Sequence, residues 1–240
     1  MSRSESNAAL LDEQVWHARL FSGTWRPPLA GGRNAVSEPA TGACLATTGQ
    51  ARAEDVALAT AAAAAQQPAW EAVAPRQRAE IFLRAAGLLQ AQAEECALFI
   101  ARETGGILPK AQHEVREAVL FLQLAAGQVM QPHGLVLPSN TGTLSYARRL
   151  PHGVVGVISP FNFPLILSIR AVAPALAAGN AVVLKPDPQT PIAGGFLIAR
   201  LFELAGLPKG VLHVLPGGAD AGAALCSDPH VRMIAFTGST

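Results

Sequence analysis

The feature that most constrains the fold is the alternation of short apolar runs with helical patterns between Pro151 and Thr240. The runs are rich in Val and Ile, too short for buried helices, and bounded by Gly, Pro or Asn. They are Gly153–Ile158, Ala181–Leu184, Val211–Leu215 and Met233–Phe236. Strands separated by helical segments of this length form βαβ units, so the pattern predicts an α/β fold with a parallel, Rossmann-like sheet and flanking helices.

Polar or glycine-rich segments follow each predicted strand. They read Ser159-Pro160-Phe161-Asn162, Lys185-Pro186-Asp187, Pro216-Gly217-Gly218 and Thr237-Gly238-Ser239-Thr240. Ligands of open α/β sheets bind beyond the carboxyl ends of the strands. We therefore expect these four segments to meet in one ligand site.

Asn162 lies in a turn that two prolines bracket, Pro160 and Pro164. Because proline fixes the backbone direction at both ends, the amide side chain could be held rigidly. A rigid amide can donate a hydrogen bond to a negative oxygen that develops during a reaction. The alternative is that Asn162 only caps the helix that begins near Pro164.

Lys185 directly follows an apolar strand and is one of three lysines in the chain. At that edge it could bind ribose hydroxyls or a 2′-phosphate, or it could be an ordinary solvated charge. An acidic residue beyond the second strand contacts the ribose 2′-OH in many dinucleotide sites. Asp187 is available for that role, whereas Pro188 is not.

Glycine-rich fingerprints of the usual nucleotide sites are absent, both Gly-x-Gly-x-x-Gly and the Walker loop. The segment Gly217–Gly222 instead places small residues where a flat ring or a phosphate could approach closely, although glycines also simply make turns. Thr237-Gly238-Ser239 is a helix-start pattern, and the free N–H groups of a helix N-terminus attract phosphate.

Composition restricts the class of protein. The chain has 240 residues, is half hydrophobic and carries a net charge of +1, so we expect neither nucleic-acid nor membrane partners. Cys44, Cys96 and Cys226 show no CxxC spacing, which indicates reduced thiols, a cytoplasmic location and no metal site. The longest apolar stretch, Phe161–Ala178, is interrupted by polar residues and prolines, which argues against a membrane span.

Residues 1–128 predict a mainly helical part that covers the sheet. Residues 21–48 read as loops with a small hairpin. Three helices are expected after it, over Glu54–Gln66 with an end near Pro68, from Pro75 to Glu103, and over Lys110–Val129.

Residues 129–150 form a separate segment with two candidate strands, Leu135–Leu137 and Leu144–Ala147, around a turn-rich connection. An isolated pair of this kind is marginal in water. We expect this β arm to pair with something else, in the same subunit or in another.

The ordered set of motifs strongly resembles the aldehyde dehydrogenase superfamily from about Phe21 onward. The motifs are Glu38–Gly42, Glu103–Gly105, Pro160–Pro164, Gly179–Pro186, Gly210–Gly217 and Phe236–Thr240. Within it, Lys185–Thr190 and Val211–Asp220 look closest to the benzaldehyde dehydrogenase branch. The resemblance implies oxidation of an aromatic aldehyde with NAD or NADP as cofactor.

The resemblance also implies residue roles. Asn162 would be the oxyanion-hole amide. The implied cofactor-binding residues are Ser159, Phe161, Lys185, Gly218, Gly222 and Ser239. Residues 151–240 would form the nucleotide-binding core, and 129–150 a homo-oligomerisation arm. Pro188 stands where this family commonly has a ribose-binding glutamate, which leaves NAD and NADP both open.

The family's nucleophilic cysteine and general-base glutamate both lie beyond the Thr-Gly-Ser-Thr motif. The thiolate attacks the aldehyde, hydride passes to the nicotinamide, and water hydrolyses the thioester. Thr237–Thr240 also begins a helix that has no residues after it. We therefore expect a truncated N-terminal portion without the catalytic domain, inactive alone. The alternative is a non-catalytic dinucleotide-binding or oligomerisation module.

Overall fold

A six-stranded mixed sheet forms the centre of the computed structural model, which describes residues 9–238. Its strand order is β10-β7-β8-β9-β1-β2. The strands are β1 (Leu20–Ser22), β2 (Trp25–Arg26), β7 (Val154–Ile158), β8 (Ala181–Lys185), β9 (Leu212–Val214) and β10 (Val231–Phe236). The four predicted apolar runs are these last four strands, and they pair in parallel.

The prediction of a purely parallel sheet is wrong at one edge. β1 pairs antiparallel with β9, and β2 antiparallel with β1, so residues predicted as loops join the main sheet. Leu20 and Phe21 are buried there. The tight turn after β1 requires glycine, because Gly23 has φ +74° and a Cβ on it would lie 2.6 Å from the Gly210 nitrogen. The N-terminal part is therefore not only a helical cover.

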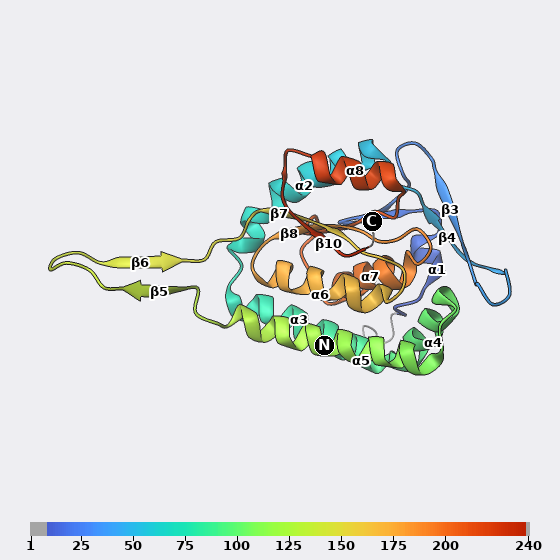
Figure 1. Cartoon of the computed structure of the whole chain (residues 1–240), viewed down its shortest axis with the longest axis horizontal. Coiled ribbons are helices and arrows are strands. Elements are labelled where there is room, and N and C mark those ends of the chain that lie inside the picture. The colour runs from blue at the N-terminus through green and yellow to red at the C-terminus, as the bar shows by residue number, and fades with distance from the viewer. Residues whose placement is uncertain (1–8, 239–240) are drawn as a thin grey trace.

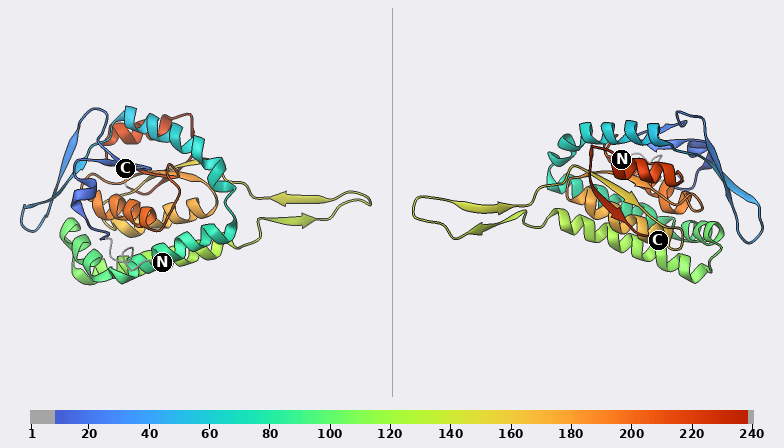
Figure 2. Two further views of the ribbon diagram at one scale, coloured as in Figure 1. Left: turned by 180° about the vertical axis from the view of Figure 1, so that it is seen from behind. Right: turned by 45° about the horizontal axis from the view of Figure 1, so that its top comes forward.

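Helices cover both faces of the sheet, as expected. On one face lie α2 (Ala53–Glu71) and α8 (Ala219–Ser227), and on the other α6 (Pro164–Ala177) and α7 (Leu197–Leu204). A further layer packs outside α6 and α7, as Figures 1 and 2 show. It contains α3 (Pro75–Ala91), α4 (Ala93–Thr104) and α5 (Leu108–Val129). A short α1 (Glu13–Trp16) and the hairpin β3 (Arg33–Ser37) and β4 (Cys44–Gly49) complete the N-terminal part.

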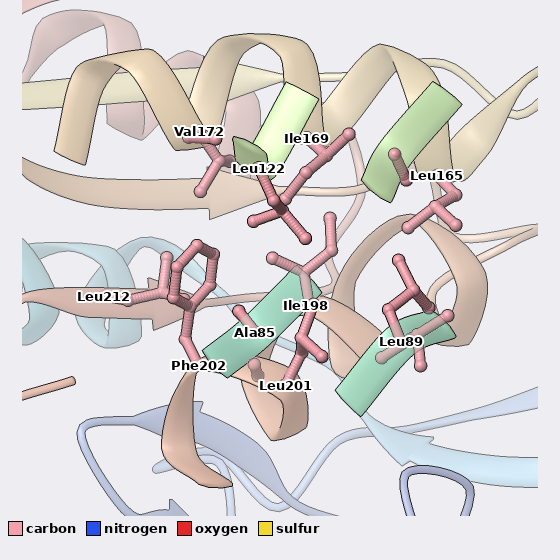
Figure 3. Packing of buried hydrophobic residues seen from close by; sticks show 14 of the residues in the cluster. Ala85, Leu89, Leu122, Leu165, Ile169, Val172, Ile198, Leu201, Phe202 and Leu212 are labelled. Atoms are coloured by element: carbon pink, nitrogen blue, oxygen red, sulfur yellow. The ribbon is translucent and has the colours of Figure 1, made fainter. Parts of the chain in front are cut away.

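The main core fills the space between the sheet and the three-helix outer layer (Figure 3). Leu122 of α5, Ile169 of α6 and Ile198 of α7 are all fully buried in it. Full burial of each such side chain stabilises the fold by roughly 1.5–3 kcal/mol. The apolar faces of these helices thus fix α6, which begins at the loop that carries Asn162.

Two helix boundaries differ from the prediction. α2 continues past Pro68 to Glu71, because Trp70 Nε1 donates to the Leu176 carbonyl at 2.9 Å and anchors the last turn. The helix predicted from Pro75 to Glu103 is two helices that meet at Gln92, whose Oε1 accepts a hydrogen bond from Leu10 N.

The predicted β arm is present as an antiparallel hairpin of β5 (Gly134–Leu137) and β6 (Ser145–Arg148). It projects away from the body of the molecule (Figures 1 and 2). Among the described residues these strands pair only with each other. Val136 is 77% exposed and Tyr146 64% exposed, so an apolar surface stands in solvent.

Within residues 9–238, no helix is long and apolar enough to cross a membrane. In the same range, no group of three or more His, Cys, Asp or Glu side chains is arranged to hold a metal ion.

His213 is a fully buried polar residue at the centre of β9. Its Nδ1 lies 2.8 Å from Ser22 Oγ, and its Nε2 lies 2.9 Å from the Gly210 carbonyl oxygen. Burial lowers the pKa of the imidazole from 6.5 to about 4, with the Gly210 hydrogen bond opposing that shift.

We predict that His213 makes stability depend on pH. As pH falls, the unfolded chain binds a proton before the folded ring does, so the neutral ring's contribution is complete above pH 6.5 and is lost as pH falls toward 4. The loss amounts to about 3 kcal/mol. Urea unfolding at several pH values measures the free energy of unfolding of the native protein and of H213N. The native protein should lose stability between pH 6.5 and pH 4 and H213N should not, so the difference between them should narrow. Equal dependence of both proteins on pH would contradict this.

Candidate functional site

The carboxyl ends of the parallel strands lie side by side, as the sequence predicted. Ile158 is in register with Lys185 on one side and with Phe236 on the other, and Leu184 is in register with Val214. The loops after β7, β8, β9 and β10 therefore leave the sheet at one edge (Figure 1). Ser239 lies outside the described residues.

Lys185 is held at this edge and is not a freely solvated charge. A Cβ on Gly222 of α8 would lie 3.7 Å from Lys185 Cδ and 4.0 Å from Ile158 Cδ1. The aliphatic stem of the lysine therefore passes beside Gly222. Burial lowers the pKa of the ammonium group, while the carboxylates of Asp187 and Asp220 raise it.

Gly218 is the N-cap of α8, and no side chain caps that helix end. The segment before it packs tightly, since a Cβ on Gly217 would lie 2.8 Å from the Ala51 carbonyl oxygen. Ala51 N also donates to the Pro216 carbonyl at 2.7 Å. Because the residues here are small, the backbone of this segment packs closely against Ala51. The first N–H groups of α8, which a helix start leaves without partners, lie at the carboxyl edge of the sheet.

Ser159 contributes its backbone to this edge. Its side chain is buried, with Ser159 Oγ 2.7 Å from Ser168 Oγ of α6, and is thus directed into the protein. Its N–H donates to the Lys185 carbonyl at 3.3 Å, which extends the pairing of β7 and β8 by one residue.

Asn162 and Phe161 are both exposed in the loop between β7 and α6. The N-cap of α6 is Phe163, and the helix has no side-chain cap, so the alternative that Asn162 caps it is wrong. Among the described residues the Asn162 amide has no hydrogen-bond partner. Phe161 borders a hollow of about 470 Å³ that also contacts Pro188 and the β3–β4 hairpin.

A buried carboxylate of the outer layer holds the start of α6. Glu114 Oε2 accepts hydrogen bonds from Leu165 N at 3.1 Å and Ile166 N at 3.5 Å. Its Oε1 lies 2.7 Å from Lys110 Nζ, and that ammonium lies 4.3 Å from the centre of the Phe163 ring. Glu114 thus satisfies two N–H groups that every helix start leaves free, and it fixes the residues next to Asn162.

A second buried acidic side chain holds the segment after β8. Glu103 accepts from Ile192 N at 2.9 Å and Ala193 N at 2.7 Å. Burial raises the pKa of Glu103 to about 8, and these two N–H donors oppose the rise. The sequence pattern indicated only a covering role for the outer helices. Glu114 was therefore missed altogether, and Glu103 was named only as part of the Glu103–Gly105 motif and not for this structural role. A signal was present, because Glu114 falls between the buried Ala111 and Ala118 on the apolar face of α5.

The turn after Lys185 is internally bonded. Asp187 Oδ1 accepts from Gln189 N at 2.9 Å, and the Pro188 carbonyl accepts from Asn34 Nδ2 at 2.8 Å. Beside it, Thr237 N donates to the Ile158 carbonyl at 3.0 Å, so the Thr-Gly-Ser motif starts next to β7.

None of the three cysteines lies at this edge. Cys44 is on β4 and Cys226 is in the last turn of α8, away from Gly218. Cys96 is buried on α4, where burial raises the pKa of its thiol to about 12 and keeps it protonated. A protonated, buried thiol is a poor nucleophile.

Residues 25–240 match the sequence profile described as "Aldehyde dehydrogenase family". The chain belongs to the aldehyde dehydrogenase family. This membership confirms the resemblance of the motif set and agrees with an α/β fold in which the strand ends meet at one edge.

Several named relatives are dehydrogenases of vanillin or benzaldehyde. The chain is 54% identical to a vanillin dehydrogenase of an Amycolatopsis strain, over 97% of this chain and 48% of that protein. It is 46% identical to a Pseudomonas putida NAD⁺-dependent benzaldehyde dehydrogenase, over 95% of this chain and 47% of that one. The crystal structure of a Corynebacterium glutamicum NAD-dependent benzaldehyde dehydrogenase superposes with a TM-score of 0.88 at 38% identity, covering 93% and 50% of the two chains. The chain thus spans about half the length of the curated relatives it matches.

Proposed function

We propose that this chain is the cofactor-binding portion of an NAD(P)-dependent dehydrogenase that oxidises an aromatic aldehyde to the carboxylic acid through a cysteine thioester. One observation carries the proposal: four parallel strands end at one edge, where the Lys185 stem lies beside Gly222. The 54% identity to a vanillin dehydrogenase supports an aromatic substrate. The nucleophilic cysteine and the general-base glutamate would come from a longer polypeptide.

The residues at the strand edge fit a dinucleotide. Space is open over Gly222, because a Cβ there meets nothing closer than 3.7 Å. In our proposal a flat adenine ring packs along Gly218 and Gly222, and Lys185 donates hydrogen bonds to ribose hydroxyls. Ser159 and Phe161 would border this cleft through backbone and ring, and Ser239, which lies outside the described residues, would hold the pyrophosphate. When bound, the nicotinamide cofactor accepts hydride from the substrate.

The cofactor could be NAD or NADP. Pro188 offers no carboxylate to repel a 2′-phosphate, while Asp187 already accepts a hydrogen bond from Gln189 N. The lysine charge suits either ribose hydroxyls or a phosphate.

Asn162 is proposed to stabilise the oxyanion of the tetrahedral intermediate. The amide is exposed, has no partner among the described residues, and stands on a loop fixed by two prolines and by Glu114. A donor held in this way requires little reorganisation when negative charge develops.

The test of function is an assay of a polypeptide extended along the downstream reading frame. Benzaldehyde and vanillin should be oxidised with NAD⁺ or NADP⁺, with short aliphatic aldehydes slower, as followed by absorbance of the reduced nicotinamide. Cofactor binding without turnover of any aldehyde would refute the assignment.

A second candidate is a non-catalytic dinucleotide-binding or oligomerisation module. Among the described residues, no cysteine at the strand edge could serve as nucleophile, which favours this candidate for the chain taken alone. Saturable cofactor binding by a stable oligomer of the 240-residue chain, without need of any further segment, would support it.

We predict that G222L weakens cofactor binding at least about tenfold, because the leucine would occupy the space over the Lys185 stem where the ring should pack. G222A should bind only slightly more weakly, since its Cβ meets Lys185 at an ordinary contact distance. It should also stabilise α8 by about 0.5–1 kcal/mol. Fluorescence titration with NAD⁺ and NADP⁺ measures the first effect and thermal unfolding the second. Equal affinities in G222L and native protein would contradict the proposed cleft.

The β5–β6 hairpin is proposed to pair with a second copy of the chain. Its strands are free on both outer edges among the described residues, and Leu135, Val136, Leu144 and Tyr146 are exposed on it. A two-stranded hairpin with such a surface gains stability by joining a larger sheet or core.

A further inference from the structure

A cavity of about 320 Å³ lies at the base of the β5–β6 hairpin, beside the residues that precede β7, whereas the strand-edge site follows the end of β7. It is bordered by the end of α2 at Glu71, the start of α3 at Pro75, and the hairpin base at His133 and Arg149. We call it the hairpin-base cavity. Neither the aldehyde chemistry nor the cofactor cleft uses any of its residues.

The hairpin-base cavity carries excess positive charge. Arg78, Arg148 and Arg149 border it, and Glu71 is the single acidic residue among its lining. Three guanidinium charges against one carboxylate leave two positive charges unmatched. Among the described residues, none of the three arginines forms an ion pair.

Arg78 is the buried member of this set, with only 4% of its surface exposed. Its Nη1 donates to the Ala177 carbonyl at 3.3 Å, and its guanidinium lies 5.8 Å from the centre of the Trp70 ring. Its Nε has no hydrogen-bond partner among the described residues. A buried guanidinium costs free energy unless acceptors surround it, and the Nε itself is out of contact with solvent, so an anion in the cavity would act on Arg78 through its charge.

Helix ends of both signs border the hairpin-base cavity. Ala74 and Pro75 border the cavity at the start of this 17-residue helix, no side chain caps that end, and its first turn contains no acidic residue. Helix starts carry a partial positive charge and free N–H groups. Ala72 and Ala178, the C-caps of α2 and α6, also border the cavity, and helix C-termini carry a partial negative charge. The net positive charge of the cavity therefore comes from the three arginines and not from the helix dipoles.

We propose that the hairpin-base cavity binds a small dianion with several oxygens, such as inorganic phosphate or a short dicarboxylate. Two unmatched positive charges correspond to a doubly charged ligand, and guanidinium groups bind phosphate and carboxylate oxygens in pairs. The volume admits several non-hydrogen atoms, because a water molecule takes about 30 Å³ of the liquid. The arginines of the hairpin and of α3 would then be joined through the anion.

The test is calorimetric titration of the purified 240-residue chain with phosphate and, separately, with succinate at constant ionic strength. Both anions should bind, and R148Q/R149Q should weaken binding by more than about tenfold, because it removes two charge-assisted contacts. The matched control R33Q/R116Q changes net charge equally at exposed arginines far from the cavity and should leave affinity within about twofold. E71Q removes the opposing carboxylate and should tighten binding several-fold.

Contrary results are clear-cut. Equal affinities of native protein and R148Q/R149Q would overturn the proposal, as would failure of both anions to bind. Loss of binding in K185Q but not in R148Q/R149Q would place the anion at the strand edge and overturn it too. Binding of only one of the two anions, still lost in R148Q/R149Q, would support the site and identify the oxygen geometry it selects. If R148Q/R149Q does not fold, the affinity of E71Q for phosphate and succinate tests the proposal instead. An affinity equal to that of the native protein would contradict the charge argument.

Discussion

Replacing Asn162 with alanine in the extended polypeptide is expected to lower kcat for aromatic aldehydes by about a hundred- to thousand-fold. The proposed amide donor acts on an oxygen that becomes negative only as the carbonyl is attacked, so its loss should fall on the rate of the chemical step. The Kd for the cofactor should stay unchanged, because in our proposal the Asn162 amide meets the substrate oxygen, whereas Lys185, Gly218 and Gly222 hold the cofactor.

The matched control is Asn140→Ala in the turn of the distant hairpin, which removes the same amide from an exposed position. Steady-state rates and cofactor titrations of both variants separate the roles. A rise in KM with kcat preserved would instead assign Asn162 to general substrate binding, and the oxyanion role would be wrong.

Replacing Glu114 with alanine is expected to destabilise the fold by about 3–5 kcal/mol, the usual cost of removing one partner of a buried ion pair. The change leaves the N–H groups of Leu165 and Ile166 without their acceptor and Lys110 without its carboxylate. Urea unfolding measures the loss. In the extended polypeptide, the same variant should also slow turnover, because Glu114 fixes the start of α6 beside Asn162.

Glu117→Ala is the control on the same helix, three residues further on, and should change stability by less than about 0.5 kcal/mol. Glu114→Gln retains an acceptor oxygen and should fall between the two. If E114A and E117A unfold at the same urea concentration, the carboxylate does not hold α6.

Local patterns predicted the central strands because each run is rich in apolar residues, β-branched ones among them, and is bounded by residues that end strands. Ala181–Lys185, between Asn180 and Pro186, is an example. The convergence of their ends followed from the rule that parallel strands present one carboxyl edge. α5 was also predicted closely, since its apolar spacing is regular over more than five turns.

The other elements depend on contacts between residues that are distant in the sequence, and no local sequence pattern predicts such contacts. The division between α3 and α4 occurs at Gln92, a residue type that does not by itself end a helix. Its side chain accepts a hydrogen bond from the backbone N–H of Leu10, which lies 82 residues earlier in the chain. β1 and β2 are too short to show a period; β1 becomes a strand by pairing with β9, and β2 by pairing with β1. The support that Glu114 and Glu103 give to the site could not be predicted for the same reason. The N–H groups that donate to these two side chains lie 51 and 89 residues further along the chain.

The pairing of Phe21 with Val214 sets an order of events during synthesis. At roughly 5–20 residues per second, a ribosome needs about 10–40 s between those two positions. Throughout that interval β1 can pair with β2 but not with β9, so this two-strand edge lacks the sheet against which Leu20 and Phe21 are buried and stays accessible to chaperones. A contact between such distant positions also closes late in refolding, so the N-terminal edge should be the last part of the sheet to gain protection from hydrogen exchange.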